Sequence, residues 1–443
     1  MSESIDYTEA PLDLDFSRGG LSLEEEGKLL RRSVLPGGVR VLSERIPHSH
    51  STSIGLWIGA GSRDEGDEAR GSTHFLEHLL FKGTRNRGAK EIAERIDYLG
   101  GDFNAATAKQ YTCYYGHCFE QDVAPSLNLL SDMVTGARLD AGDMEMERGV
   151  ILEELSMYND DAAEVAHEAI TSMVFGDHPL GRPVGGTRES VSALANESLH
   201  NHYSAMYGPS ELVVTAAGAV DHEQLCERVH AELEAGGWDM SGPGVPEPRR
   251  TASLIAPVEP ATRYIERPVE QAAVILAAPS FDLFDERRRA LFAMNAILGG
   301  GTSSRLFQKI REERGLAYST YSFPSLFPEG GMYGMYAGCA VANASEVATL
   351  LAACLEEIAA DGVSDAEVES AYRRIRAEII FSNEHLSSHM NRLGNAELIR
   401  GSLTSQSELL RKARAVTAAD VQEVAQFIAS QPRSLVTVGP AVG

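Results

Sequence analysis

The first part of the chain alternates between the periodicity of strands and that of helices. Apolar residues alternate with small or polar ones from Ser51 to Ala60, which predicts a strand. Ile92 and Ile96 fall on one face of a predicted helix that ends at Gly100-Gly101. The predicted elements of this part, in order, are a strand at 51–60, helices near 70–82 and before Gly100, strands at 102–108 and 111–119, and a helix at 123–134.

The second part of the chain repeats this order. Leu306 and Ile310 share one face of a predicted helix that ends at Gly315. The predicted elements of this part are a strand at 271–278, a helix at 285–298, the helix ending at Gly315, strands at 316–323 and 331–339, and a helix at 345–358. Corresponding elements lie roughly 215–220 residues apart, and an internal duplication is the simplest explanation.

A stretch rich in Gly and Pro separates the two parts. Residues 236–248 read GGWDMSGPGVPEP, which suits neither a helix nor a central strand and predicts a linker. Strands that follow one another through short turns favour antiparallel pairing. The expected fold class is therefore α+β, with two homologous α/β sandwich halves, each a mostly antiparallel sheet packed with helices. The expected domains are a disordered tail at 1–33, a first half at 34–235, a linker at 236–260 and a second half at 261–443.

The composition excludes several classes of protein. Acidic residues number 64 and basic residues 39, and the net charge of -25 argues against nucleic acid or an anionic membrane as a partner. No apolar run reaches the ~18 residues of a membrane-spanning helix. The 5 cysteines contain no CxxC pair, which fits a reducing compartment. Residues 1–16 carry acidic residues and no Lys or Arg, unlike a secretory or mitochondrial signal, so we expect a cytoplasmic protein.

The residues that carry chemistry lie in the segment GSTHFLEHLLFKGT, whose centre is an H-x-x-E-H motif. On a helix, His74 and His78 project from one face about one turn apart, so that two ring nitrogens can meet one Zn²⁺. Glu77 lies beside the same face and can reach a metal-bound water without being a ligand. Ser72 or Thr73 is expected to cap the start of this helix. The alternative is a structural one, with two histidines on a half-buried helix face and a solvated glutamate.

A catalytic zinc usually has three protein ligands, so a third must come from elsewhere. The best candidate is the segment DMEMERGVILEEL at 143–155, read as a helix. Glu147 and Glu154 share one face of this helix, two turns apart, whereas Glu153 points about 100° away from Glu154. Such a pair can supply one ligand and one carboxylate that orients a histidine. Acidic helix faces are usually only solvated, and spacing alone does not decide between these readings.

Taken together, these segments resemble the pitrilysin or insulinase family of zinc metallopeptidases (M16). The resemblance extends from about residue 34 to 440 and is strongest to the short-chain branch, which includes the mitochondrial processing peptidase β subunit and its bacterial relatives. The segments that carry it are HFLEHLLFKGT, GGDFNAATAKQYTCYY, ERGVILEEL, FGDHPLGRPVGGT and GGGTSSRLFQKIREERGLAYSTYS.

The resemblance implies a role for individual residues. His74, His78 and Glu154 would be the zinc ligands, with Glu77 as general base and Glu147 as a supporting acidic residue. In the second half, which has no zinc motif, Arg311 and Tyr318 match an arginine–tyrosine pair that reaches the substrate and the zinc site. The remaining matches are those of the edge strand that receives substrate, Asn104, Ala105, Ala106 and Thr107.

The implied function is that of a zinc metalloendopeptidase that hydrolyses short or unfolded peptides in a closed chamber. Zinc would polarise the scissile carbonyl and activate water, and Glu77 would move the proton. Because short-chain members need two chains to close the chamber, we expect a homodimer, or a heterodimer with an inactive homologue. The alternatives are a non-catalytic scaffold of the same fold, like the respiratory core subunits, and a peptide-binding module with structural zinc. Such scaffolds have usually lost ligand or base residues that this chain keeps.

Overall fold

The computed structural model describes residues 7–13 and 20–441, which group into two compact units. Unit 1 comprises the chain up to Glu153 together with 183–250 and 381–405. Unit 2 comprises 154–182, 251–380 and the chain from 406 onward. Two continuous helices, α4 (Ala141–Asp160) and α11 (Asp365–Ser382), cross the unit boundaries. The predicted domain ranges describe the duplicated halves of the sequence and stay a prediction. The compact units do not coincide with those halves, because residues 154–182 belong to unit 2 and residues 381–405 to unit 1.

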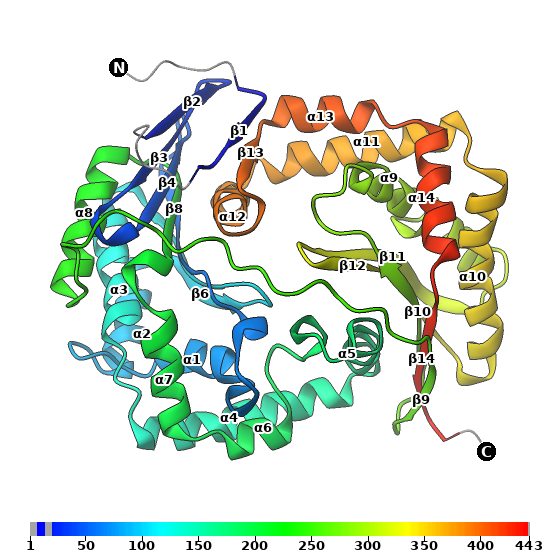
Figure 1. Cartoon of the computed structure of the whole chain (residues 1–443), viewed down its shortest axis with the longest axis horizontal. Coiled ribbons are helices and arrows are strands. Elements are labelled where there is room, and N and C mark those ends of the chain that lie inside the picture. Colours follow the sequence, from blue (N-terminus) through cyan, green and yellow to red (C-terminus); the bar gives the residue numbers. More distant parts are fainter. Residues whose placement is uncertain (1–6, 14–19, 442–443) are drawn as a thin grey trace. The chain divides into compact units, whose positions relative to one another are not determined.

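Unit 1 is built on a seven-stranded sheet with the strand order β2-β3-β4-β8-β5-β7-β6 (Figure 1). All neighbours pair antiparallel except β4 and β8, which are parallel. The strand β6 therefore lies at one edge of this sheet. The strands are β2 (Leu21–Glu25), β3 (Lys28–Val34), β4 (Arg40–Arg45), β5 (Ser51–Ile58), β6 (Asp102–Thr107), β7 (Thr112–Phe119) and β8 (Leu212–Gly218).

Helices pack on both faces of this sheet. α3 contacts β5 and β7, and α8 contacts α3 and β4, whereas α12 contacts β4, β5 and β8. A short pair of strands, β1 (Glu9–Pro11) and β13 (Ser402–Thr404), joins the beginning of the chain to the segment after α12. The helices of unit 1 are α1 (Ser72–Leu80), α2 (Ala89–Leu99), α3 (Val123–Gly136), α6 (Arg188–Ala193), α7 (Asn196–Met206), α8 (His222–Ala235), α12 (Leu386–Asn395) and the start of α4.

The predicted disordered tail is wrong for the residues that the structure describes. The segments 7–13 and 20–33 contain β1, β2 and most of β3. Tyr7, Leu12, Leu23 and Leu30 are buried in one core cluster with Leu393 of α12. Long-range burial of these apolar side chains, which local composition does not reveal, orders the segment. The rest of the predicted tail, residues 1–6 and 14–19, lies outside the described residues.

Unit 2 is built on a five-stranded sheet with the order β11-β12-β10-β14-β9. Only β9 and β14 pair parallel. The strands are β9 (Thr262–Glu266), β10 (Ala272–Ser280), β11 (Ala317–Phe327), β12 (Gly330–Cys339) and β14 (Ser434–Gly439). The helices are α5 (Ala162–Phe175), α9 (Arg288–Gly299), α10 (Ala344–Asp361), α13 (Gln406–Arg414), α14 (Ala418–Ser430), most of α11 and a π-helical segment at Phe307–Glu312.

The alternation along β10 explains the two cores of unit 2. Ala273 and Ile275 point to one face, where they are buried with Ile170 of α5. Val274 and Leu276 point to the other face, where they are buried with residues of α9, α10 and α14. A strand that is buried on both faces has apolar residues at consecutive positions, and β10 has this pattern.

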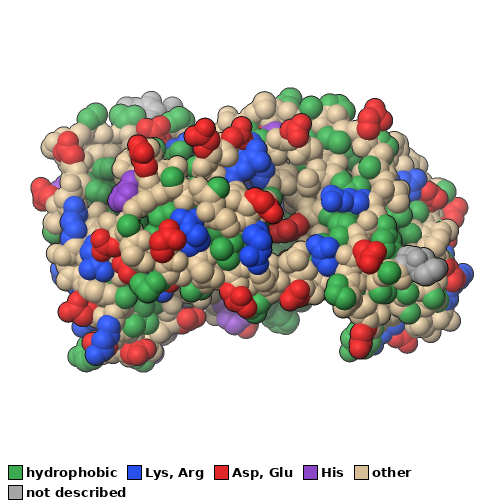
Figure 2. Space-filling view, turned by 90° about the horizontal axis from the view of Figure 1, so that it is seen from below, with side chains coloured by type: hydrophobic (Ala, Val, Ile, Leu, Met, Phe, Trp, Pro, Cys, Tyr) green, Lys and Arg blue, Asp and Glu red, His purple; other side chains and the backbone are tan. Residues whose placement is uncertain are grey.

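The expected fold class is confirmed. The strand orders β4-β8-β5-β7-β6 and β9-β14-β10-β12-β11 are the same arrangement, with the single parallel pair at the same place. The predicted strands and helices of both parts are present, except that the helix predicted to end at Gly315 is the π-helical segment, which ends at Glu312. No described helix combines the length and apolar composition that a bilayer crossing needs. On the face drawn in Figure 2, acidic and basic side chains are interspersed.

Candidate metal centre

Helix α1 presents the two histidines of the motif because its other face is apolar. Phe75, Leu76, Leu79 and Leu80 are fully buried, and the burial of these side chains fixes the rotation of the helix. His74 and His78 are left half-buried, with ring centroids 4.8 Å apart and ring planes inclined at 73°. The two imidazoles therefore converge from successive turns, as the i, i+4 spacing predicts.

The helix start differs from the sequence expectation. The N-cap is Gly71 rather than Ser72 or Thr73, and Gly71 adopts the left-handed conformation with φ 90°. The carboxylate of Glu65 caps the helix instead, since it accepts hydrogen bonds from the Gly71 and Thr73 backbone nitrogens at 2.7 Å each. Glu65 is buried, and its negative charge at a helix N-terminus is favourable. Sequence reasoning missed Glu65 because its role depends on a chain reversal between it and the helix.

Glu154 completes a cluster with the two histidines. One potential ligand atom from each of His74, His78 and Glu154 lies within 4.8 Å of the others. In the described part of the chain, this is the one such group of three His, Cys, Asp or Glu side chains. Glu154 is the first residue of unit 2, but it follows Glu153 within the continuous helix α4. Glu153 itself is exposed.

This donor set fits zinc. Two imidazoles and one carboxylate are the ligands of many catalytic zinc sites, which keep a fourth position open. Ligand atoms of a tetrahedral zinc lie about 3.4 Å apart, given metal–ligand distances of 2.0–2.1 Å. The 4.8 Å spread of the three ligand atoms exceeds this by an amount that side-chain rotation can close.

Glu147 lies behind His78 instead of in the cluster. Its Oε2 is 3.1 Å from His78 Nδ1, and its Oε1 is 2.5 Å from Lys82 Nζ. Glu147 is 3% exposed, so the ammonium and the imidazole replace the water that this carboxylate loses. With the Nδ1 proton donated to Glu147, His78 directs the lone pair of Nε2 away from the carboxylate. The structure thus gives Glu147 and Glu154 different positions, which their spacing left open, and their roles stay a prediction.

The sequence analysis did not identify two residues that contact the candidate site. Lys82 lies one turn beyond His78, and Tyr158 lies one turn beyond Glu154 on α4. The Tyr158 hydroxyl donates a hydrogen bond to Glu154 Oε1 at 2.8 Å. Both residues are four positions from a candidate ligand, and that spacing is the signal that could have identified them.

Glu77 is held by the edge strand. The Thr107 hydroxyl at the end of β6 donates a hydrogen bond to Glu77 Oε2. Asn104 and Ala106 are exposed on β6, while Ala105 and Thr107 are half-buried. The edge position of the predicted substrate strand is confirmed, and its use by substrate stays a prediction.

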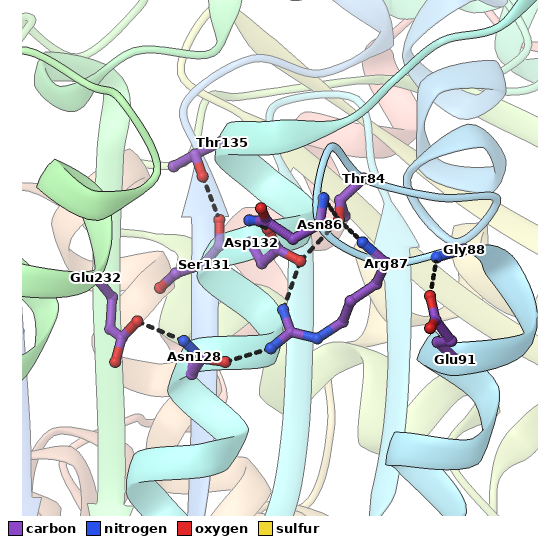
Figure 3. A network of polar contacts seen from close by, with 10 residues as sticks. All are labelled: Thr84, Asn86, Arg87, Gly88, Glu91, Asn128, Ser131, Asp132, Thr135 and Glu232. Carbon is purple, nitrogen blue, oxygen red and sulfur yellow. Dashed lines mark hydrogen bonds and ion pairs between the residues drawn. The ribbon is translucent and has the colours of Figure 1, made fainter.

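A polar network fixes the loop that follows α1 (Figure 3). Asp132 of α3 accepts hydrogen bonds from the Thr84 hydroxyl at 2.7 Å, the Asn86 side chain at 2.7 Å and Arg87 Nη1 at 2.5 Å. Arg87 also donates to Asn128 at 2.6 Å. Because this loop follows Lys82 directly, anchoring it on α3 restricts the position of the lysine that contacts Glu147.

Neutral groups pack behind the motif helix. Burial, with a smaller effect from the Arg250 charge, lowers the pKa of His202 to about 4. His202 Nε2 lies 3.2 Å from the hydroxyl of Thr73. Burial and the neighbouring Tyr207 raise the pKa of Tyr114, whose hydroxyl lies 2.9 Å from that of Tyr207. These side chains support α1 without placing a competing charge against its buried face.

Arg311 and Tyr318 contact one another within unit 2. Arg311 Nη1 donates to the Tyr318 carbonyl oxygen at 2.9 Å, and its guanidinium carbon lies 4.8 Å from the centroid of the Tyr318 ring. The Tyr318 side chain is 73% exposed. Their predicted roles with substrate stay a prediction.

The chain combines a duplicated α+β fold with a cluster of donors that fits zinc. The model of the insulinase family (peptidase family M16) matches residues 40–188, and that of the peptidase M16 inactive domain matches residues 193–375. The chain belongs to family M16.

Relatives span nearly the whole chain. An uncharacterized zinc protease of Streptomyces coelicolor is 41% identical over 415 residues, which are 93% of this chain and 90% of the relative. An uncharacterized zinc protease of Mycobacterium tuberculosis is 40% identical over 93% of both chains. A peptidase M16 inactive domain from Pseudomonas fluorescens shares the fold with a TM-score of 0.85 at 19% identity, over 94% of this chain and 98% of its own.

Proposed function

We propose that this protein is a zinc-dependent endopeptidase whose metal is held by His74, His78 and Glu154. The observation that carries the proposal is the convergence of these three ligand atoms within 4.8 Å beside Glu77. Family membership and the names of the relatives, which are called zinc proteases, support it. When bound, zinc would supply a Lewis acid that polarises the scissile carbonyl and lowers the pKa of water.

The chain's own residues supply the remaining parts of the mechanism. Glu77, which accepts a hydrogen bond from the Thr107 hydroxyl, would take a proton from the attacking water and deliver it to the leaving amine. Glu147 and Lys82 hold the His78 ring in one orientation and tautomer. Tyr318 and Arg311, from the resemblance to the family, would bind the substrate carbonyl as negative charge develops on its oxygen.

The substrate we propose is an extended peptide. A peptide that pairs with the edge strand at Asn104–Thr107 would be bound mainly through its backbone, with little dependence on sequence. Short or unfolded peptides can adopt that conformation freely, whereas a folded protein can offer only its exposed extended segments. We also propose a cytoplasmic homodimer that encloses the substrate, with a heterodimer as the variant of this assembly.

Two variants test the proposal. Glu77→Gln should keep stoichiometric zinc and lose hydrolysis of a quenched peptide library by about 10²-fold or more, because only the proton carrier is lost. His74→Ala should lose the metal itself, measured by elemental analysis. Exposed His200 provides the matched control, since His200→Ala should change neither quantity.

A non-catalytic scaffold remains the competing function, and the same experiment distinguishes it. A scaffold would leave the peptide library intact with zinc present and with zinc removed. A binding module with structural zinc would retain peptide binding while showing no cleavage. Normal cleavage by Glu77→Gln would remove the general-base assignment, and full zinc in His74→Ala would remove the ligand assignment.

A further inference from the structure

The two units share not only a strand order but also the helix that follows the equivalent strands. α3 follows β7 through the turn at Glu120–Asp122, and α10 follows β12 through the turn at Val341–Asn343. The helices begin directly after these turns, at Val123 and Ala344. Positions along α3 and α10 can therefore be compared one by one, counting from these two residues.

In unit 1, helix α8 covers one side of α3 (Figure 1). Its apolar stripe, Leu225, Val229 and Leu233, follows the i, i+4, i+8 pattern and is buried. Asn128 on α3 donates a hydrogen bond to Glu232 of α8 at 2.6 Å (Figure 3). The side of α3 that meets α8 therefore combines apolar burial with one polar contact.

A guanidinium closes the C-terminal end of α8. Arg85 Nη2 donates to the carbonyl oxygen of Gly236, the C-cap residue of α8, and to that of Thr135 on α3 at 3.2 Å. A cation at this end is favourable, because the last carbonyl groups of a helix have no partners within it and carry partial negative charge.

In unit 2 the equivalent surface is an open groove of about 740 Å³. We call it the α10 groove; it is lined by Ala348, Thr349 and Ala352 of α10 together with Tyr264 and Leu435 of the neighbouring strands. In unit 2, β14 is followed among the described residues by Pro440 and Ala441, and neither belongs to a helix. The described part of unit 2 thus has no counterpart of α8.

The burial of matched positions shows the same difference. Leu127 and Ser131 on α3 are buried, whereas their counterparts Ala348 and Ala352 on α10 are only partly buried. The position of Asn128, which contacts α8, is taken by Thr349, which is exposed. The stripe of α10 that a second helix would cover is therefore partly exposed and carries small side chains.

We propose that the α10 groove binds an amphipathic helix of a partner protein, one with apolar residues at i, i+4 and i+8. The equivalence with α8 sets its direction. Arg433 lies at one end of the groove, 2.7 Å from Glu356, and Glu356 takes the position of Thr135, beside which Arg85 meets the end of α8. By this equivalence the C-terminal end of the bound helix lies beside the Glu356–Arg433 pair, in which Arg433 offsets the negative charge of Glu356.

A partner protein fits this groove better than a second copy of the chain or a polar small molecule does. α8 has this pattern, but its apolar stripe is already buried in unit 1. The exposed Met146 and Val150 of α4 do not complete it, because the i+8 position is Glu154. Apart from the Glu356–Arg433 pair, the groove is lined by apolar residues, small residues and Tyr264, which suit the apolar face of a helix.

The test uses a peptide with the sequence of residues 221–236, Cys226 replaced by Ser, an amidated C-terminus and an N-terminal fluorescein, added to the full chain. Fluorescence anisotropy should show saturable binding, and a peptide with Leu225, Val229 and Leu233 replaced by Ser should not bind. Ala348→Glu should weaken binding at least about tenfold by placing a charge in the groove. Ala360→Glu, the same change at an exposed position of α10, should leave binding unchanged.

Three results would overturn the proposal. One is the absence of saturable binding up to about 1 mM peptide. Another is equal binding by wild type and Ala348→Glu, which would place the peptide elsewhere. The third concerns the oligomeric state measured by light scattering. If the wild type is a dimer and Ala348→Glu is a monomer, the groove is occupied by a second copy of the chain. Should Ala348→Glu fail to fold, Thr349→Trp fills the groove from an exposed position and should abolish binding in the same assay.

Discussion

Glu147 Oε2 lies 3.1 Å from His78 Nδ1, although Glu147 is not a member of the ligand cluster. The pair joins α4 to the motif helix, and Lys82 holds the second carboxylate oxygen. A carboxylate behind a metal-bound histidine raises the basicity of the ring and fixes its orientation. The same carboxylate would repel a second anion placed beside the ring. Removing this carboxylate should therefore lower the affinity for zinc, although Glu147 is not in the ligand cluster.

Glu147→Ala should lower zinc affinity by about 10- to 100-fold. The physical reason is that His78 loses its orienting partner and Lys82 loses its counter-charge. Zinc transfer to a competing chelator, followed by absorbance, measures the affinity. Glu153→Ala, on the exposed side of the same helix, is the control and should bind zinc like wild type. Unchanged affinity in Glu147→Ala would show that the contact with His78 has no effect on the metal.

Thr107 should position Glu77. Thr107→Val removes the hydroxyl that donates to Glu77 Oε2 but keeps the shape of the side chain. We expect kcat to fall about tenfold, with zinc content and KM unchanged, because the proton carrier keeps its carboxylate and loses only its positioning partner; loss of the carrier itself costs about 10²-fold or more. Thr107→Ser restores the donor and should recover most of the activity. A loss confined to KM would indicate that Thr107 contacts substrate rather than the base.

Tyr158 should restrain the proposed third ligand. Its hydroxyl donates to Glu154 Oε1 at 2.8 Å, which favours one orientation of the carboxylate. Tyr158→Phe should weaken zinc binding by less than Glu147→Ala does, because Tyr158 is 48% exposed and water can replace its hydroxyl. Tyr98→Phe, at a tyrosine that is 78% exposed on α2, is the control. Chelator competition should show the weakest zinc binding in Glu147→Ala, stronger binding in Tyr158→Phe and the strongest in Tyr98→Phe.

Most of the fold could be predicted because its signals are local. The apolar runs of β5 and β10 and the helical stripe of α10 are properties of short segments, and both copies carry them. The ordered N-terminal segment could not be predicted in the same way. Leu23 and Leu30 stand among acidic and basic residues, and they are buried only because α12, far along the chain, supplies Leu393 to the same cluster. Such partners are invisible to periodicity.

The site was predictable to a similar degree. Spacing on one helix was enough to pair His74 with His78, and the resemblance to a family proposed Glu154. Spacing did not separate Glu147 from Glu154, since both point from one face of α4. Which one faces the histidine pair depends on how α4 crosses α1. Glu65 was missed for the same reason, because it reaches the start of α1 through a turn that only the folded chain defines.

Tyr318→Phe tests the role that the family resemblance assigns to this residue. The substitution keeps the ring that lies 4.8 Å from the Arg311 guanidinium and removes only the hydroxyl. If that hydroxyl stabilises the developing negative charge, kcat should fall by about 10²-fold while zinc content stays unchanged. Tyr98→Phe, at an exposed tyrosine of α2, is the control and should keep full activity. Full activity in Tyr318→Phe would exclude the hydroxyl from the reaction.

His222 should make unit 1 less stable as the pH falls. Burial, assisted by the positive charge of Arg31, lowers the pKa of His222 to about 4. Its Nδ1 and Nε2 lie 2.8 Å and 2.9 Å from the hydroxyls of Ser43 and Ser33, and Asp221 and Glu223, whose charges act in the opposite direction, flank it. The folded state therefore favours the neutral ring.

The sign of the pH dependence follows from this depressed pKa. An unfolded chain takes up the proton near pH 6.5, so the stability contributed by neutral His222 is complete above that pH and is lost as the pH falls towards 4. The loss approaches about 3 kcal/mol. Urea unfolding of wild type and His222→Gln at several pH values should show their difference in unfolding free energy shrinking from pH 7.5 to pH 4. His200→Gln, at an exposed position, is the control for the substitution itself. A flat difference for His222→Gln would mean that the pKa of this ring is the same in the folded and the unfolded protein.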